Sequence, residues 1–320
     1  MAEYCTRCRM RSKWCTRCYP PPPDRKARQE VSTQTEGNPE FSLSESLESG
    51  NLADVEVSVE SWLFPGQRET FKAHKMILAL QSDVFKAMFY GAFAKEDRIV
   101  ITDLHPEGVR GLLRYFYSRR LDVQTAYQAA CTRTAAAKYL VPELEERCLA
   151  FMNERMVTDE VCAFLDYVLT MGEEALATPA TILIVKDSIG VLSSATFMTC
   201  TEETVRYVLK HAANVPEASV LKVVYGWGQQ RLTRADHSYS TRLRRKGRGL
   251  EGEPVDFRAV MRPLLPELRF LALTAKEFVD GPNTWGMFTD AEARAVLSNI
   301  VKEGSMAMAK GFCEIRKARG

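Results

Sequence analysis

All of the β-strand patterning in this 320-residue chain falls within residues 55–104, and the sequence beyond has the periodicity of helices. Valine alternates with polar residues over 55–60, which is typical of a strand with one buried face. The Pro65-Gly66 turn and a second strand over 69–73 complete a predicted hairpin, and residues 98–104 predict a third strand. Strands followed by a run of helices indicate an α+β domain with a helical extension.

A short amphipathic helix is predicted in front of this sheet. Phe41, Leu43 and Leu47 lie at helical spacing with Ser and Glu between them, and Gly50-Asn51 gives a C-terminal stop. A stripe this short cannot form a core alone, so we expect a partner to cover it.

The helices that accompany and follow the third strand are also predicted from spacing. One buried helix is expected over 76–90, because Leu80, Val84 and Met88 recur at intervals of four. Proline is tolerated in the first helical turn. Three further helices are therefore expected, one opened by Pro106, one over 123–139 and one opened by Pro142.

From Thr158 onward the pattern is helical, and no strand is predicted after residue 104. Thr158, Thr201 and Thr289 are predicted N-caps, and Glu292 gives the last of them a capping-box spacing. The basic segment 233–253 is predicted to be a solvated loop between helices.

The composition is that of an ordinary soluble protein, with 46% hydrophobic residues, 26% charged residues and a net charge of +2. No apolar run is long enough to span a membrane, and the first residues lack a secretory signal. We therefore expect a cytoplasmic protein that can also enter the nucleus, with no membrane partner and no nucleic acid partner. Four cysteines sit inside apolar helical patterns and are expected to be buried free thiols, namely Cys131, Cys148, Cys162 and Cys200.

Residues 1–40 combine a cysteine-rich head with a proline run and a polar stretch, which predicts a disordered tail or linker. The head holds two C-x-x-C pairs formed by Cys5, Cys8, Cys15 and Cys18. Four thiolates suit tetrahedral zinc, but the pairs are closer together than in usual zinc ribbons. The sequence leaves open a zinc knuckle and an unliganded tail, and no other cofactor is expected.

Several segments resemble the BTB/POZ domain in order and spacing. They are ADV at 53–55, FKAHK at 71–75, SDVFKAMF at 82–89, LRYFYS at 113–118 and AAAKYL at 135–140. Further along, VYGWG at 224–228 and RFLALTAKEF at 269–278 resemble the BACK domain. The resemblance implies a BTB/POZ domain over 41–153, a BACK-like helical domain over 154–303 and a basic tail over 304–320.

The resemblance extends to the BTB-domain-containing proteins that carry BTB, BACK and then a β-sandwich called the PHR domain. This sequence stops where that sandwich would start, so we expect the PHR domain to be missing. The resemblance also implies a homodimer. Its interface would contain the residues Phe41, Leu43, Leu47, Asp54 and Lys75.

A cullin-3 surface is the second feature that the resemblance implies. The matching positions are Met88, Tyr90, Phe93, Lys95, Glu96 and Tyr117. Lys95 stands where the family has a glutamate, and Glu96 lies one residue further on. A lysine there can reverse an electrostatic contact, so cullin binding is either served by Glu96 or weakened.

Catalysis is not expected. His74 sits inside a structural motif of the resembled family, and Gly247-Arg248-Gly249-Leu250-Glu251-Gly252 follows a basic run instead of a strand. The favoured function is a non-enzymatic adaptor that brings a protein substrate to a cullin-3-type ubiquitin ligase. The alternatives are a nuclear transcriptional regulator of the BTB class and a short protein that pairs with longer family members.

Overall fold

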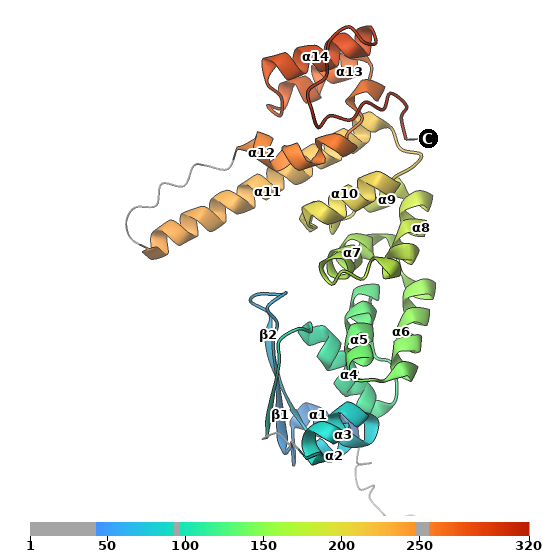
Figure 1. Cartoon of the computed structure of the whole chain (residues 1–320), viewed down its shortest axis with the longest axis vertical. Coiled ribbons are helices and arrows are strands. Elements are labelled where there is room, and N and C mark those ends of the chain that lie inside the picture. The colour runs from blue at the N-terminus through green and yellow to red at the C-terminus, as the bar shows by residue number, and fades with distance from the viewer. Residues whose placement is uncertain (1–42, 93–96, 247–255, 320) are drawn as a thin grey trace, which may run out of the picture. The chain divides into compact units, whose positions relative to one another are not determined.

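The computed structural model describes residues 43–92, 97–246 and 256–319, and for residues 235–246 it describes the backbone alone. The N-terminal part of this region is a small sheet with helices, and the rest is helical (Figure 1). The first elements are α1 Leu43–Ser49, β1 Val55–Glu60, β2 Arg68–Ala73, α2 Lys75–Gln81, α3 Asp83–Tyr90 and β3 Arg98–Ile101. Three longer helices follow, α4 Pro106–Ser118, α5 Ala126–Lys138 and α6 Pro142–Arg155.

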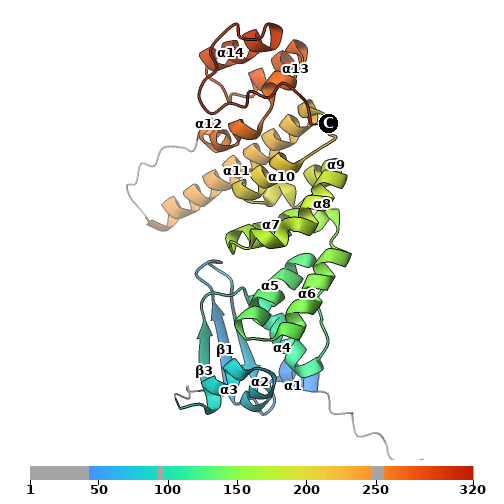
Figure 2. The same ribbon diagram turned by 45° about the vertical axis from the view of Figure 1, so that its right-hand side comes forward.

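The sheet has three strands in the order β2-β1-β3. β1 and β2 form the predicted antiparallel hairpin, in which Val57 is opposite Phe71. β3 runs parallel to β1, with Ile99 opposite Val57, and both strands are visible side by side in Figure 2. The third strand ends at Ile101, three residues before the predicted end, and the helices between β1 and β3 form the crossover that parallel strands need.

The single helix predicted over 76–90 is wrong, because the chain breaks there into α2 and α3. Ser82 between them has an extended backbone, with φ −149° and ψ 126°. Its hydroxyl accepts the N–H of Phe85 at 3.5 Å and donates to the carbonyl of Tyr139 at 2.6 Å. Ser82 followed by Asp83 is an N-cap signal, and it stops one helix and starts the next.

The prolines open helices as predicted. Pro106 and Pro142 occupy the first turns of α4 and α6, and the imidazole of His105 caps α4 by accepting the N–H of Glu107 at 3.1 Å. Val109, Leu112, Leu113, Phe116 and Tyr117 of α4 are buried. Its contacts with β1, β2 and α5 place it between the sheet and the other helices.

The helical region that follows contains α7 Val161–Thr170, α8 Thr178–Lys186, α9 Ser188–Ser193, α10 Glu202–His211, α11 Glu217–Lys246, α12 Phe257–Met261, α13 Ala275–Asp280 and α14 Asp290–Val301. Short 3-10 helices connect them, η1 Thr158–Glu160, η2 Glu174–Ala177, η3 Phe197–Thr199, η4 Arg262–Glu267, η5 Phe270–Ala272 and η6 Pro282–Thr284. As predicted, no strand follows residue 104 in the described ranges.

Helix caps in this region match the sequence with one exception. Thr201 and Thr289 are N-caps, and Thr289 with Glu292 forms the capping box. Thr158 is not an N-cap, since Val157 precedes η1 in that place and the Thr158 hydroxyl faces Asp187 at 3.4 Å. The Thr158 hydroxyl thus hydrogen-bonds Asp187, the N-cap residue of α9, and does not cap its own helix.

The predicted loop over 233–253 is wrong in its first half. α11 continues to Lys246 without interruption, and the first glycine of the segment is Gly247. Arginine and leucine favour a helix once one is nucleated. Trp227, in the middle of α11, is buried and its indole N–H donates to the carbonyl of Cys200 at 3.1 Å.

Residues 304–319 belong to the segment predicted to be a basic tail, but they pack on the helical region. Phe312 and Cys313 are buried, and the N–H of Val215 donates to the carbonyl of Arg319 at 3.1 Å. Arg319 and Glu217 form an ion pair in which each side chain is 1% exposed. Cys131, Cys148, Cys162 and Cys200 are buried free thiols, as predicted.

Candidate protein-interaction surfaces

Three strongly exposed apolar residues lie close in sequence to the predicted dimer residues Asp54 and Lys75. They are Leu52 before β1 and Met76 and Leu80 on α2, and we call them the α2 face. Their exposed fractions are 84%, 63% and 76%. Met76 and Leu80 lie four residues apart on one side of α2, while Leu78 between them is fully buried. Large apolar side chains gathered on one face mark interaction sites more often than solitary ones do.

Leu52 is also unusual in its backbone. Its φ of 61° is left-handed, a region that costs a branched side chain about 1 kcal/mol or more. The preceding Gly50 is left-handed too, and a Cβ there would meet the Lys72 side chain at 2.9 Å. The tight turn between α1 and β1 thus holds Leu52 outward.

Leu80 is exposed, although its spacing in the sequence predicts a buried position. Treating 76–90 as one helix gives Leu80 the same phase as Val84 and Met88, but the break at Ser82 shifts that phase. Val84 and Met88 then pack against the core from α3, while Leu80 points to solvent from α2. The Ser82-Asp83 cap signal is the feature that could have revealed the break.

The other predicted dimer residues lie on or beside α1 and α2. Leu43 is exposed, Leu47 is half-buried against the core, and Phe41 lies outside the described residues. Asp54 does not pair with the Lys75 ammonium. Its carboxylate accepts the backbone N–H of Lys75 at 2.7 Å and so caps α2.

The Lys75 ammonium pairs with Asp97 instead. This hydrogen bond raises the pKa of Lys75 above its ordinary value. Lys75 is therefore bound by two carboxylates. Asp54 accepts from its backbone N–H, and Asp97 pairs with its ammonium.

His74 is fully occupied by local hydrogen bonds, as expected for a structural histidine. Its Nε2 lies 2.8 Å from the Asn51 carbonyl, and its Nδ1 lies 2.7 Å from the Tyr117 hydroxyl. The carbonyl can only accept, so we assign the proton to Nε2 and Nδ1 accepts from Tyr117. The same hydroxyl accepts the His74 backbone N–H at 2.9 Å.

The predicted cullin-binding residues divide into exposed, buried and undescribed ones. Tyr90, at the end of α3, is 62% exposed, and Met88 is half-buried. Tyr117 is only 4% exposed, and burial raises its pKa to about 12. The Tyr117 hydroxyl hydrogen-bonds His74, so Tyr117 has a structural role in the interior of the domain. Phe93, Lys95 and Glu96 lie outside the described residues.

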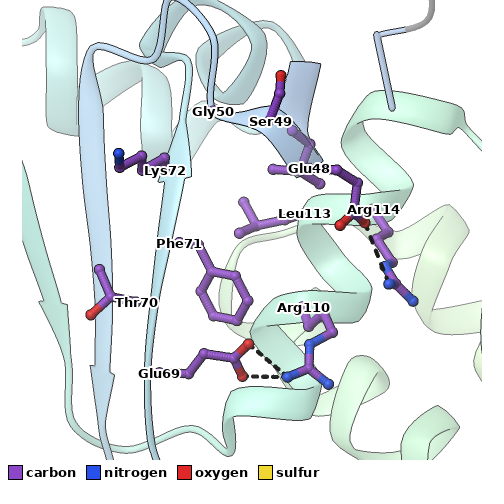
Figure 3. Close-up of a pocket in the computed structure, with 11 residues that line it drawn as sticks. Glu48, Ser49, Gly50, Glu69, Thr70, Phe71, Lys72, Arg110, Leu113 and Arg114 are labelled. Atoms are coloured by element: carbon purple, nitrogen blue, oxygen red, sulfur yellow. Dashed lines mark hydrogen bonds and ion pairs between the residues drawn. The ribbon is translucent and has the colours of Figure 1, made fainter. Parts of the chain in front are cut away.

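A pocket of about 400 Å³ lies between the end of α1, strand β2 and helix α4 (Figure 3). Arg110 donates to both carboxylate oxygens of Glu69 at 2.6 Å, and Arg114 reaches Glu48 at 3.4 Å. These arginines are already neutralised by neighbouring carboxylates. We therefore interpret these ion pairs as structural contacts that link α4 to β2 and α1, and we do not interpret the pocket as an anion site.

A buried histidine and three aromatic rings connect the sheet domain to α7. His105 is only 3% exposed, and its ring lies against those of Phe64 and Tyr127, with ring centroids 4.8 and 5.6 Å away. Phe64 also stacks on Tyr167 at 5.7 Å. Burial lowers the pKa of His105, which therefore stays neutral near pH 7.

No metal site and no membrane span can be assigned from this geometry. Within the described ranges, no group of His, Cys, Asp and Glu has a metal-binding arrangement, and no helix there is long and apolar enough to cross a membrane. Cys5, Cys8, Cys15 and Cys18 lie outside the described residues.

Comparison with known proteins identifies the first domain. The model of the BTB/POZ domain family matches residues 43–156. Human BTB/POZ domain-containing protein 6 is 29% identical over 247 residues, which cover 77% of this chain and 43% of that protein. Zebrafish BTB/POZ domain-containing protein 6-B is 30% identical over 232 residues, covering 72% and 45%.

A third relative, human BTB/POZ domain-containing protein 3, is 29% identical over 197 residues, covering 61% of this chain and 37% of that protein. The chain thus spans less than half the length of these curated relatives. Among solved structures, the BTB domain of zebrafish PATZ1 aligns with 34% of this chain and 84% of its own, with 23% identity and a TM-score of 0.28.

These relatives are named for the domain and not for an enzymatic activity. The three-stranded sheet flanked by helices is the fold that the family match predicts. Residues 43–156 of this chain therefore form a BTB/POZ domain, and a helical region follows it.

Proposed function

We propose that this protein is a dimeric, non-enzymatic adaptor that recruits a protein substrate to a cullin-3-type ubiquitin ligase. The observation that carries the proposal is the exposed α2 face of Leu52, Met76 and Leu80 on a BTB/POZ domain. BTB/POZ domains mediate dimerisation and protein interaction. A second copy of the same face would remove this patch from water through a twofold, self-complementary contact.

The expected gain is large enough to matter for assembly. Full burial of a Leu or Met side chain contributes about 1.5 to 3 kcal/mol. A twofold contact buries each residue of the α2 face twice, once per protomer. Charged side chains at its edge, including Lys75, would then fix the register more than the affinity.

The cullin would bind at the other end of the α2–α3 pair. Tyr90 is exposed there, three residues before Phe93 in the chain, and aromatic side chains are frequent anchors of protein interfaces. An adaptor accelerates ubiquitin transfer by holding the substrate near the ligase, so it requires no catalytic side chain of its own.

Calorimetry with the N-terminal region of cullin-3 tests this proposal. We expect micromolar or tighter binding to wild type, weakened at least tenfold in Tyr90→Ala and in Phe93→Ala. Lys95→Glu restores the acidic residue of the resembled family and is expected to tighten binding. Trp62→Ala is the matched control, because Trp62 is equally aromatic and 70% exposed but lies after β1. The absence of binding in wild type and in Lys95→Glu would refute the ligase role.

The α2 face also supports a second arrangement, in which this chain pairs with the BTB/POZ domain of a longer relative. The support is that the family model matches residues 43–156 and that the longer relatives are named for the same domain. Mixing the purified protein with the human protein 6 domain and measuring mass distinguishes the two. Mixed dimers at the expense of self-pairs favour the second arrangement.

A further inference from the structure

The helical region carries a groove that the proposed adaptor function leaves unused. It has a volume of about 390 Å³ and lies between α11, α13 and η6, and we call it the α11–α13 groove. Its wall is mostly apolar and aromatic. A pocket near the lower end of the roughly 300–1,000 Å³ range suits one or two side chains better than a folded surface.

The groove is rigidly built. Leu221 and Leu273 form its buried floor. Tyr225 and Trp285 form one wall and stack on each other, with centroids 4.6 Å apart and planes 23° from parallel. A preformed aromatic wall loses little conformational entropy when a ligand binds.

Gly281 allows α13 to end close to this wall. A Cβ at that position would lie 2.9 Å from the carbonyl oxygen of Glu277 and 3.4 Å from the Trp285 ring. A larger residue would therefore clash with the Glu277 carbonyl and would bring its Cβ into contact with the indole.

The polar tips of these two rings have no hydrogen-bond partner among the described residues. Both side chains are half-buried, yet within the described residues no hydrogen bond reaches the Tyr225 hydroxyl or the Trp285 indole N–H. Tyrosine and tryptophan with an apolar body and an available polar tip are enriched at interfaces. The tips can therefore hydrogen-bond the backbone of a bound peptide.

The charge at the rim of the groove is mainly acidic. Glu277 and Asp280 contribute two carboxylates from α13, against the single ammonium of Lys222 on α11. None of the three forms an ion pair within the described ranges. Hydrogen bonds from the Thr274 backbone and hydroxyl lower the pKa of Glu277, so it is charged at neutral pH.

From this combination we infer that the α11–α13 groove binds a short peptide segment of a partner protein, which inserts one bulky apolar side chain and places a neighbouring lysine or arginine on Glu277 and Asp280. The carboxylates disfavour anionic ligands such as nucleic acid, and the floor disfavours a wholly polar peptide. This binding requires neither dimerisation nor cullin, so it stands or falls independently of the proposed function.

A random dodecamer library displayed on phage, panned on the full chain, supplies the probe. We expect enriched peptides to hold an apolar residue within three positions of a lysine or arginine. Their affinity, measured by fluorescence anisotropy on the synthetic peptides, should fall at least tenfold in Trp285→Ala. Asp280→Lys should weaken them several-fold, and more strongly at low salt than at high salt.

Glu154→Lys is the control for the charge change, since Glu154 is exposed on α6 away from the groove. Circular dichroism melts identify any variant that fails to fold, and Asp280 is exposed, so its substitution keeps the test valid if Trp285→Ala unfolds. An empty library, an acidic consensus, or binding unchanged in Asp280→Lys would overturn the inference. So would a Trp285→Ala variant that lowers the mass of the peptide-free protein, because a second copy would then be the occupant.

Discussion

Replacing Arg319 with methionine should destabilise the helical region strongly, because it leaves the buried carboxylate of Glu217 without its ion-pair partner. Arg319 donates to both carboxylate oxygens of Glu217, to the carbonyl of Glu267 at 2.6 Å and to that of Leu209 at 3.2 Å. Without it, the described residues offer the Glu217 carboxylate one remaining hydrogen bond, from the N–H of Arg269 at 3.1 Å. Breaking one side of a buried pair costs about 3 to 5 kcal/mol.

Urea denaturation followed by circular dichroism measures this loss. Roughly 3 to 5 kcal/mol corresponds to a fall in Tm of about 6 to 20 °C for a region of this size. Replacing both partners, as Arg319→Met with Glu217→Leu, should recover part of the loss, because no unpaired charge then remains. The Leu209 and Glu267 carbonyls still lack their donor, so recovery should be incomplete.

Lys317→Met is the matched control, since Lys317 is a nearby exposed cation. It should change the free energy of unfolding by about 0.5 kcal/mol or less. If Arg319→Met cost no more than Lys317→Met, the reasoning that the C-terminal residues are an integral part of the helical region would be refuted.

Two further predictions concern the sheet domain. Burial lowers the pKa of His105 in the folded protein. As the pH drops below about 6.5, this histidine is protonated in the unfolded chain before it is protonated in the folded one, so stability should fall. Melts at pH 7.5 and 5.5 should show a smaller loss in His105→Gln than in wild type, and equal losses would contradict the assignment. Ser82→Ala removes the cap of α3 and the donor to Tyr139, so urea denaturation should show a loss of about 1 to 3 kcal/mol. Ser44→Ala, on exposed α1, should leave stability nearly unchanged, and an equal loss there would mean that the cap is not the cause.

Local signals predicted most elements of this fold. The valine alternation of β1 and the first-turn prolines of α4 and α6 depend on neighbours in the sequence, and each gave the right element. The break at Ser82 was also a local signal, but the apolar spacing around it fits an unbroken helix equally well. The exposure of Leu80 follows from that break and was missed with it.

Long-range contacts could not be predicted in the same way. The ion pair of Glu217 and Arg319 joins residues 102 positions apart. Nothing in the basic C-terminal sequence predicts that one of its arginines is buried. The α11–α13 groove likewise brings together Tyr225 and Trp285, which lie far apart in the sequence. Periodicity reports which face is apolar, but not which distant element covers it.

Sedimentation equilibrium of the full chain tests the central claim most directly, because an adaptor of this kind requires the α2 face to hold two protomers together. We expect a mass twice the 36.1 kDa of one chain for the wild type, and a monomer for Met76→Glu combined with Leu80→Glu. Since both side chains are exposed, the double variant should melt as a folded protein. A wild-type monomer, or a dimer that survives both substitutions, would contradict the claim.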